Sequence, residues 1–157
     1  MRAPKLTAFL LSLAIFVFLS CQKTSEVEKE NIYVGKAIQM TGAQETPAVS
    51  TSATGTIDAE YNRLTKTLSY KFTFSGLTDS TTAAHIHGLA EAGVPAPVVQ
   101  TFSPWPKVKA GSYSGTLLVD GVKITETDLL AGRYYINVHS KVFPSGEIRG
   151  QLILSKQ

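Results

Sequence analysis

The chain has 157 residues, of which 43% are hydrophobic and 17% are charged. This length and composition fit one globular domain and exclude an intrinsically disordered chain. The formal net charge is only +3, and two of the basic residues, Arg2 and Lys5, lie at the very start. The rest of the chain is therefore close to neutral, which excludes the basic surface that nucleic-acid binding needs.

The first 20 residues are typical of an export signal. A basic start precedes an apolar run over residues 6–19, which is too short for a membrane span of about 20 residues. Residues 18–21, with the sequence FLSC, are similar to the lipobox of bacterial lipoproteins, although phenylalanine stands where leucine is usual. We predict a signal peptide over residues 1–20 and lipidation of Cys21; the alternative is an ordinary signal or N-terminal anchor with an incidental cysteine.

Residues 21–31 are mostly polar and predict a flexible tether between the lipid and a folded domain. Gln22, rather than aspartate, follows the cysteine, and in lipoproteins of Gram-negative bacteria this favours delivery to the outer membrane. We therefore expect an outer-membrane lipoprotein of the cell envelope, anchored in the membrane by its lipid and facing the periplasm or the cell surface.

Alternation of apolar and polar residues dominates the remainder and predicts an all-β fold. It is clearest over residues 67–75, where Leu68, Tyr70, Phe72 and Phe74 share one face. The predicted strands cover residues 32–40, 54–61, 67–75, 83–87, 112–119, 134–140 and 148–154, with a further short strand near 98–99. About seven to eight short strands separated by turns indicate one antiparallel β-sandwich domain over residues 32–157.

One short helix is predicted before the strand at 134–140. Thr125 suits its N-terminal cap, Asp128 follows three residues later, and Gly132 suits its end. The leucines between them are expected to pack the helix against the sheet.

Three histidines are the most informative local feature. His85 and His87 form an H-x-H pair, whose side chains project from one face of a strand, and His139 lies in another predicted strand. Their apolar neighbours take the opposite face, so we predict imidazoles outside the core and turned toward solvent. If strand pairing brings them together, three histidines with an open fourth position suit Zn or Cu. The alternative is that they hydrogen-bond to loop backbone and hold the sheet corner.

Further polar residues accompany the histidines in the last two long strands. Asn137 shares the predicted face of His139, and Glu147 and Arg149 alternate with the apolar Ile148. For Glu147 and Arg149 we expect an exposed cross-strand ion pair, which contributes little to stability. No nucleophile with a partnered base and no glycine-rich phosphate loop is recognisable in the sequence, so no catalytic residue is predicted.

Several of these stretches, in the same order, resemble the CHRD domain family. They are residues 41–49 (TGAQETPAV), 84–88 (AHIHG), 130–140 (LAGRYYINVHS) and 143–151 (FPSGEIRGQ). The resemblance covers about residues 33–154. It implies an immunoglobulin-like sandwich that is similar in architecture to copper/zinc superoxide dismutase, in which an H-x-H strand carries metal ligands.

The favoured interpretation is a non-catalytic envelope module that binds a protein, a glycan or a metal ion such as Cu or Zn, the metal through His85, His87 and His139. The alternative is a metalloenzyme of the copper/zinc superoxide dismutase type that uses the same histidines. The dismutase pattern holds two metals and needs more histidines, whereas this chain has three in all. An enzyme is therefore the less favoured interpretation.

Overall fold

The computed structural model describes residues 29–157. The predicted signal peptide and Cys21 lie outside the described residues and stay predictions. No helix of the described segment is long and apolar enough to cross a membrane. This segment contains a complete sandwich with its own hydrophobic core, so we expect it to fold by itself.

Most of the described chain is extended, as the alternating pattern predicts. The strands are β1 (Ile32–Thr41), β2 (Thr54–Asn62), β3 (Thr67–Ser75), β4 (Thr81–Gly88), β5 (Val98–Thr101), β6 (Gly111–Leu118), β7 (Tyr134–Ser140), β8 (Ile148–Gln151) and β9 (Ser155–Lys156). A 3-10 turn, η1 (Gly42–Gln44), follows β1, and the short helix α2 (Glu126–Leu130) precedes β7.

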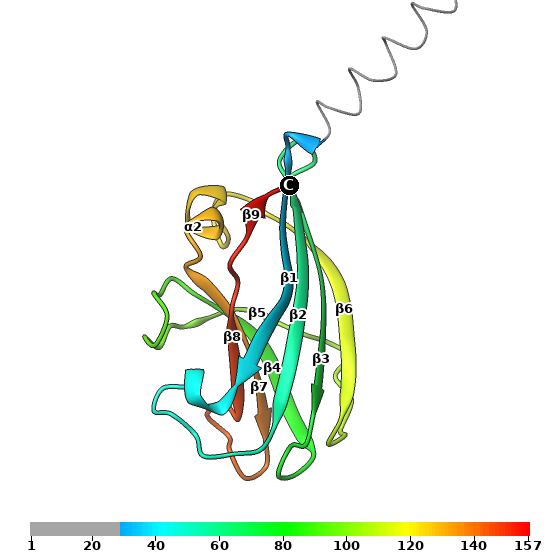
Figure 1. Cartoon of the computed structure of the whole chain (residues 1–157), viewed down its shortest axis with the longest axis vertical. Coiled ribbons are helices and arrows are strands. Elements are labelled where there is room, and N and C mark those ends of the chain that lie inside the picture. The colour runs from blue at the N-terminus through cyan, green and yellow to red at the C-terminus, as the bar shows by residue number, and fades with distance from the viewer. Residues whose placement is uncertain (1–28) are drawn as a thin grey trace, which may run out of the picture.

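The strands form a single antiparallel sheet in the order β5-β4-β7-β8-β1-β2-β3-β6, and β9 pairs with β1. The link between β8 and β1 is narrow, because only Thr41 and Arg149 are paired there. The sheet curls at this link, and its two halves enclose one core (Figure 1). The all-β prediction is confirmed, and the architecture is sandwich-like.

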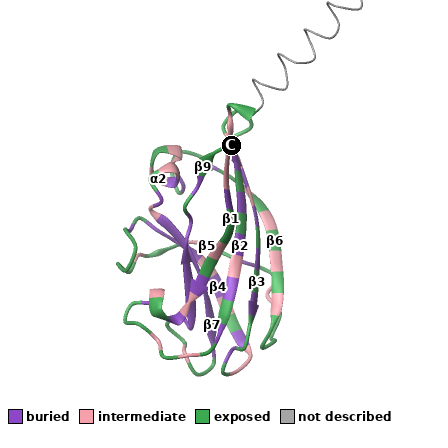
Figure 2. Ribbon diagram, in the orientation of Figure 1, coloured by how far each residue is buried: buried purple, intermediate pink, exposed green. Residues whose placement is uncertain are grey.

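Alternation on β3 shows why the core forms. Leu68, Tyr70, Phe72 and Phe74 are all buried, whereas Lys71 between them is exposed. By contrast, the neighbouring edge strand β6 is coloured intermediate and exposed along its length in Figure 2. The ring of Phe72 lies 5.2 Å from that of Phe102, which follows β5 and belongs to the opposite half of the sheet. Aromatic contacts of this kind join the two halves across the core.

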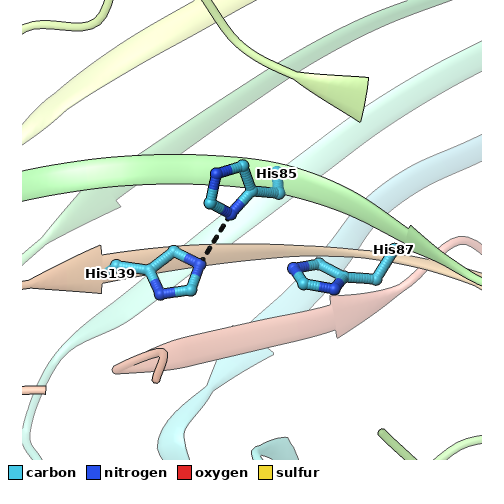
Figure 3. A group of neighbouring side chains, drawn as sticks. All are labelled: His85, His87 and His139. Atoms are coloured by element: carbon cyan, nitrogen blue, oxygen red, sulfur yellow. Dashed lines mark hydrogen bonds between the residues drawn. The ribbon is translucent and has the colours of Figure 1, made fainter. Parts of the chain in front are cut away.

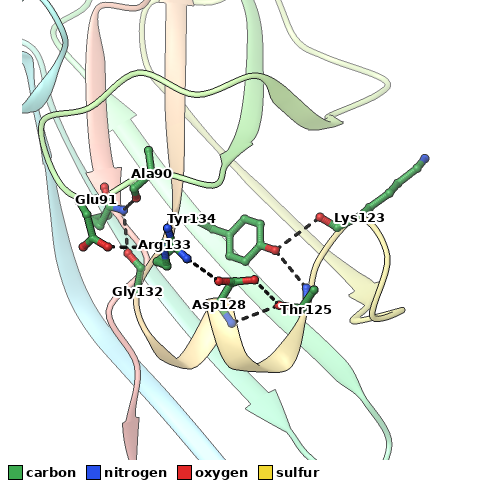
Figure 4. Close-up of polar contacts among 9 residues, drawn as sticks. Ala90, Glu91, Lys123, Thr125, Asp128, Gly132, Arg133 and Tyr134 are labelled. Carbon is green, nitrogen blue, oxygen red and sulfur yellow. Dashed lines mark hydrogen bonds and ion pairs between the residues drawn. The ribbon is translucent and has the colours of Figure 1, made fainter.

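The predicted helix and its cap are confirmed. The Thr125 hydroxyl accepts a hydrogen bond from the Asp128 backbone N–H at 3.1 Å, which satisfies a free donor of the first turn. Gly132 has a positive φ of 71°, a conformation that glycine adopts at a helix end without steric cost. Asp128 also pairs with Arg133, which begins the return into the sheet (Figure 4).

The last predicted strand, residues 148–154, is shorter than expected. Strand β8 ends at Gln151, because the Ile153 N–H turns back to the Gln151 carbonyl at 3.0 Å. The chain then continues to β9, which pairs with the start of β1. Leu152 and Leu154 are nevertheless buried, as the alternation predicts.

Candidate metal centre

Neighbouring strands β4 and β7 bring the three histidines together. In their register His85 lies opposite Asn137, His87 opposite Tyr135 and Ala83 opposite His139. Since directly opposed residues share a face, the imidazoles project from the same side of the sheet. One ring nitrogen from each histidine lies within 4.8 Å of the others, and the rings converge in Figure 3.

Two histidines are oriented by backbone carbonyls. His87 Nδ1 donates to the Ala96 carbonyl at 2.8 Å, and His139 Nδ1 donates to the Pro144 carbonyl at 2.9 Å. A carbonyl can only accept, so in each neutral ring the proton is on Nδ1 and Nε2 presents a lone pair. Metal-ligating histidines are commonly oriented in this way.

The other ring nitrogens of His87 and His139 both lie next to the side-chain oxygen of Asn137. Nε2 of His87 lies 3.0 Å from Oδ1 of Asn137, and Nε2 of His139 lies 2.9 Å from the same oxygen. The third ring joins them, because His85 Nδ1 lies 2.9 Å from His139 Nε2 (Figure 3). The centre thus gathers electron pairs around one small volume.

The histidines lie outside the apolar core, as predicted, but His87 and His139 are not turned toward solvent, which was also predicted. His87 is 9% exposed and His139 is 7% exposed, and only His85 is half-buried. The loops that supply the Ala96 and Pro144 carbonyls cover this face of the sheet. Local alternation determines the face of a strand but carries no information about a loop folding over it.

Burial keeps the imidazoles neutral. It lowers the pKa of His85 to about 4, with further lowering from the nearby His139 and His87. It also lowers the pKa of His87 and of His139, against the opposing effect of their bonds to the Ala96 and Pro144 carbonyls. Neutral rings keep the lone pairs that metal ligation requires.

Arg149 is not the exposed ion-pair partner that the sequence predicts. Its side chain is 1% exposed, and its guanidinium lies 3.4 Å from the centre of the Tyr135 ring. The other face of Tyr135 stacks on His87 at a centroid distance of 4.8 Å. Arg149, Tyr135 and His87 therefore form one continuous stack on the histidine face of the sheet.

The same guanidinium holds the loop that covers His87. It donates to the Val94 carbonyl at 3.0 Å, to the Glu91 carbonyl at 3.4 Å and to the side-chain oxygen of Gln151 at 2.9 Å. The Ala96 N–H in this loop donates to the hydroxyl of Tyr135. Arg149 therefore positions the loop whose Ala96 carbonyl orients His87.

Glu147 also departs from its predicted role. It is fully buried, and the four salt bridges of residues 29–157 include neither Glu147 nor Arg149. Its Oε1 accepts three hydrogen bonds at 2.8 Å, from the Thr51 hydroxyl and from the N–H and hydroxyl of Thr78. Glu147 thereby ties together the loops after β1, β3 and β7.

Glu45 is a buried carboxyl whose place beside the centre the sequence does not reveal. It is 8% exposed, and burial raises its pKa to about 7 against the lowering effects of the Arg149 charge and an Asn137 hydrogen bond. Asn137 therefore stands between Glu45 and the histidines. The strand pattern offers no signal for Glu45, because it lies in the loop after η1; only its place in the TGAQETPAV stretch draws attention to it.

The fold and this site define a class of protein: a small all-β domain with a histidine cluster beneath two loops. The chain belongs to the CHRD domain family, whose model matches residues 37–152. None of the curated proteins and none of the solved structures compared with the chain matches it.

Proposed function

We propose that this CHRD domain is a non-catalytic, lipid-anchored module of the cell envelope that binds one transition-metal ion through His85, His87 and His139. The observation that carries this proposal is the convergence of their ring nitrogens within 4.8 Å. Carbonyls hold two of the rings so that their lone pairs point inward. Such second contacts orient ligands and raise their basicity.

The balance of donors and acceptors supports a cation at the centre. Nε2 of His87 and Nε2 of His139 each lie at hydrogen-bonding distance from Oδ1 of Asn137, and with the amide in this orientation no hydrogen is available for either contact. A metal ion bound by the three rings would relieve this conflict. It would also take the place of the hydrogen shared between His85 and His139.

The ligand set favours Zn or Cu over hard cations. Three neutral imidazoles suit borderline metals such as these, whereas Mg²⁺ and Ca²⁺ prefer oxygen ligands. Three protein ligands leave one position of a tetrahedral site open. That position could take water or a donor group of a bound partner.

Binding is favoured over catalysis by the ligands present. The two-metal arrangement of copper/zinc superoxide dismutase needs more histidines than the three in this chain. Location at the envelope rests on the signal-like segment and on the lipobox-like stretch ending at Cys21. Gln22 supports the outer membrane as the destination.

Metal analysis tests the proposal directly. The chain from residue 29 onward should be purified without chelator and its metal content measured before and after loading with Zn²⁺ or Cu²⁺. We expect about one ion per chain. His85→Ala and His139→Ala should each lose most of the uptake, while Lys71→Ala, on the exposed face of β3, should retain it.

Two further measurements separate the alternatives. Absence of uptake, or equal uptake by the histidine variants, would overturn the metal site. Superoxide turnover by the copper-loaded chain would favour the enzyme. Asn137→Asp tests the donor and acceptor balance. The aspartate would place a negative charge beside Nε2 of His87 and of His139, which should tighten metal binding and destabilise the metal-free form. If instead the Asn137 amide were rotated and donated to both rings, metal affinity would not rise.

A further inference from the structure

A cavity lies next to the histidine centre and is lined by none of its three histidines. It has a volume of about 410 Å³ and lies between residues 45–50, in the loop after η1, and residues 142–146, in the loop between β7 and β8. Both loops lie at the end of the sandwich opposite the C-terminus (Figure 1). Small-molecule sites have volumes of about 300–1,000 Å³, so the cavity can hold a small organic molecule.

The walls of this cavity are apolar and it has one ionisable group. Pro47, Val49, Phe143 and Pro144 line it, together with smaller and hydroxyl-bearing residues, and Glu45 is the only lining residue that can carry a charge. Mostly apolar walls with a few polar groups are the usual composition of a specific ligand site.

The carboxyl of Glu45 has an unmet hydrogen-bonding capacity. The residue is 92% buried, and its Oε1 has no hydrogen-bond partner, so the Asn137 hydrogen bond that lowers the pKa of the carboxyl leaves this oxygen unsatisfied. A buried polar atom without a partner loses its hydration without compensation and calls for an explanation. The charge of Arg149 acts on Glu45, but the guanidinium donates its hydrogen bonds to the Val94 and Glu91 carbonyls and to Gln151.

The frame around the cavity is preformed. The Gly42 carbonyl accepts hydrogen bonds from the N–H groups of Glu45 and Val49, which hold the first loop. On the second loop, the Gly146 N–H donates to the Phe143 carbonyl, and the Pro144 carbonyl accepts from His139. A ligand would therefore enter a site whose backbone is already ordered, which lowers the entropic cost of binding.

We propose that this cavity binds a small primary amine, with its ammonium group on the Glu45 carboxylate and its apolar body against Pro47, Val49 and Phe143. An ammonium brings three hydrogen-bond donors and the charge that complements the only ionisable group of the lining. A carboxylate ligand would meet the same charge, and an alcohol would provide one donor without charge.

The test uses benzylamine, benzyl alcohol and benzoate as probes on the chain from residue 29 onward, in chelator so that no metal contributes. It is done above pH 7, because burial raises the pKa of Glu45 to about 7 and the ammonium needs the ionised carboxylate. Binding is followed by two-dimensional NMR, which also reports folding. We expect saturable shifts of residues 45–50 and 142–146 with benzylamine, at least tenfold weaker binding of the alcohol, and none of benzoate.

Variants identify the anchor and the cavity. Glu45→Gln should weaken benzylamine binding at least tenfold, whereas Glu60→Gln, on an exposed position of β2, should leave it unchanged. Ala48→Trp places a large ring at an exposed lining position and should block binding even if Glu45→Gln is poorly folded. The proposal is overturned if no probe saturates, if the alcohol binds as well as the amine, or if Ala48→Trp binds normally. Because chelator is present throughout, these outcomes are independent of the metal proposal.

Discussion

Replacing Arg149 by methionine tests the role of the buried guanidinium in covering the histidine centre. Methionine retains much of the length and apolar bulk of arginine but has no donors. The change would leave the Val94 and Glu91 carbonyls and the Gln151 side chain without their present partner. It would also remove the cation from the face of Tyr135.

The magnitude follows from these contacts. Hydrogen bonds to charged groups contribute about 1.5–3 kcal/mol each, and two of the three are short, to Val94 and to Gln151. Relief of the buried charge offsets part of this loss, because an isolated buried cation is itself costly. We expect a net loss of about 3–4 kcal/mol in the free energy of unfolding, or about 10 °C in Tm for a domain of this size.

Urea denaturation measures the global loss, and amide hydrogen exchange locates it. The Ala96 N–H, which donates to Tyr135, should exchange faster by more than the global destabilisation requires, because the loop opens locally. Arg133→Met is the matched control. Arg133 is 41% exposed and pairs with Glu91 and Asp128 (Figure 4), so its loss should cost under about 1 kcal/mol.

Equal costs for Arg149→Met and Arg133→Met would refute this reasoning. So would a large loss of stability with unchanged protection of Ala96, because Arg149 would then support the sheet and not the loop.

The remaining predictions concern pH and the core. Burial raises the pKa of Glu45 to about 7, so the folded state retains a proton that the unfolded state loses near pH 4.5. The contribution of Glu45 to the free energy of unfolding should therefore fall as pH rises from 4.5 to 7, whereas the lowered pKa values of His85, His87 and His139 make their contribution rise over the same interval. In urea titrations the free energy of unfolding of Glu45→Gln should therefore increase with pH relative to that of the wild type, and a constant difference would contradict the raised pKa. Hydrogen bonds from Lys66 and Tyr61 lower the pKa of Glu126 to about 2, so its contribution should be lost as pH falls from 4.5 to 2, more steeply in the wild type than in Glu126→Gln. In thermal unfolding Phe72→Ala should cost about 3–5 kcal/mol and the exposed Lys71→Ala under about 0.5 kcal/mol; equal costs would contradict the inward face of β3.

Much of the fold can be predicted because a strand has a period of two. Alternation alone places Phe72 inside and Lys71 outside, and both predictions are confirmed. The helix after Thr125 is equally local, since its cap involves residues three apart. The same periodicity predicts that His85 and His87 share a face, which the register with β7 confirms.

The sequence could not predict that the residues of the histidine centre lie close together. His139 meets His85 because β7 is one of the two strands that pair with β4, the other being β5. Arg149 was expected at the surface, and it is buried because residues from the loop after β4 close over it. Glu45 reaches Asn137 from a loop more than 90 positions earlier in the chain.

The sequence by itself determined which residues extend, which faces are apolar and on which face each histidine lies, because these depend on backbone geometry over a few neighbouring residues. Only the tertiary structure decided which strands are neighbours and which polar groups the loops seal from water. Those outcomes depend on contacts between distant segments, whose closure entropy and packing are shared by the whole chain. The depth of the histidine centre and the burial of Arg149, Glu147 and Glu45 belong to this second group.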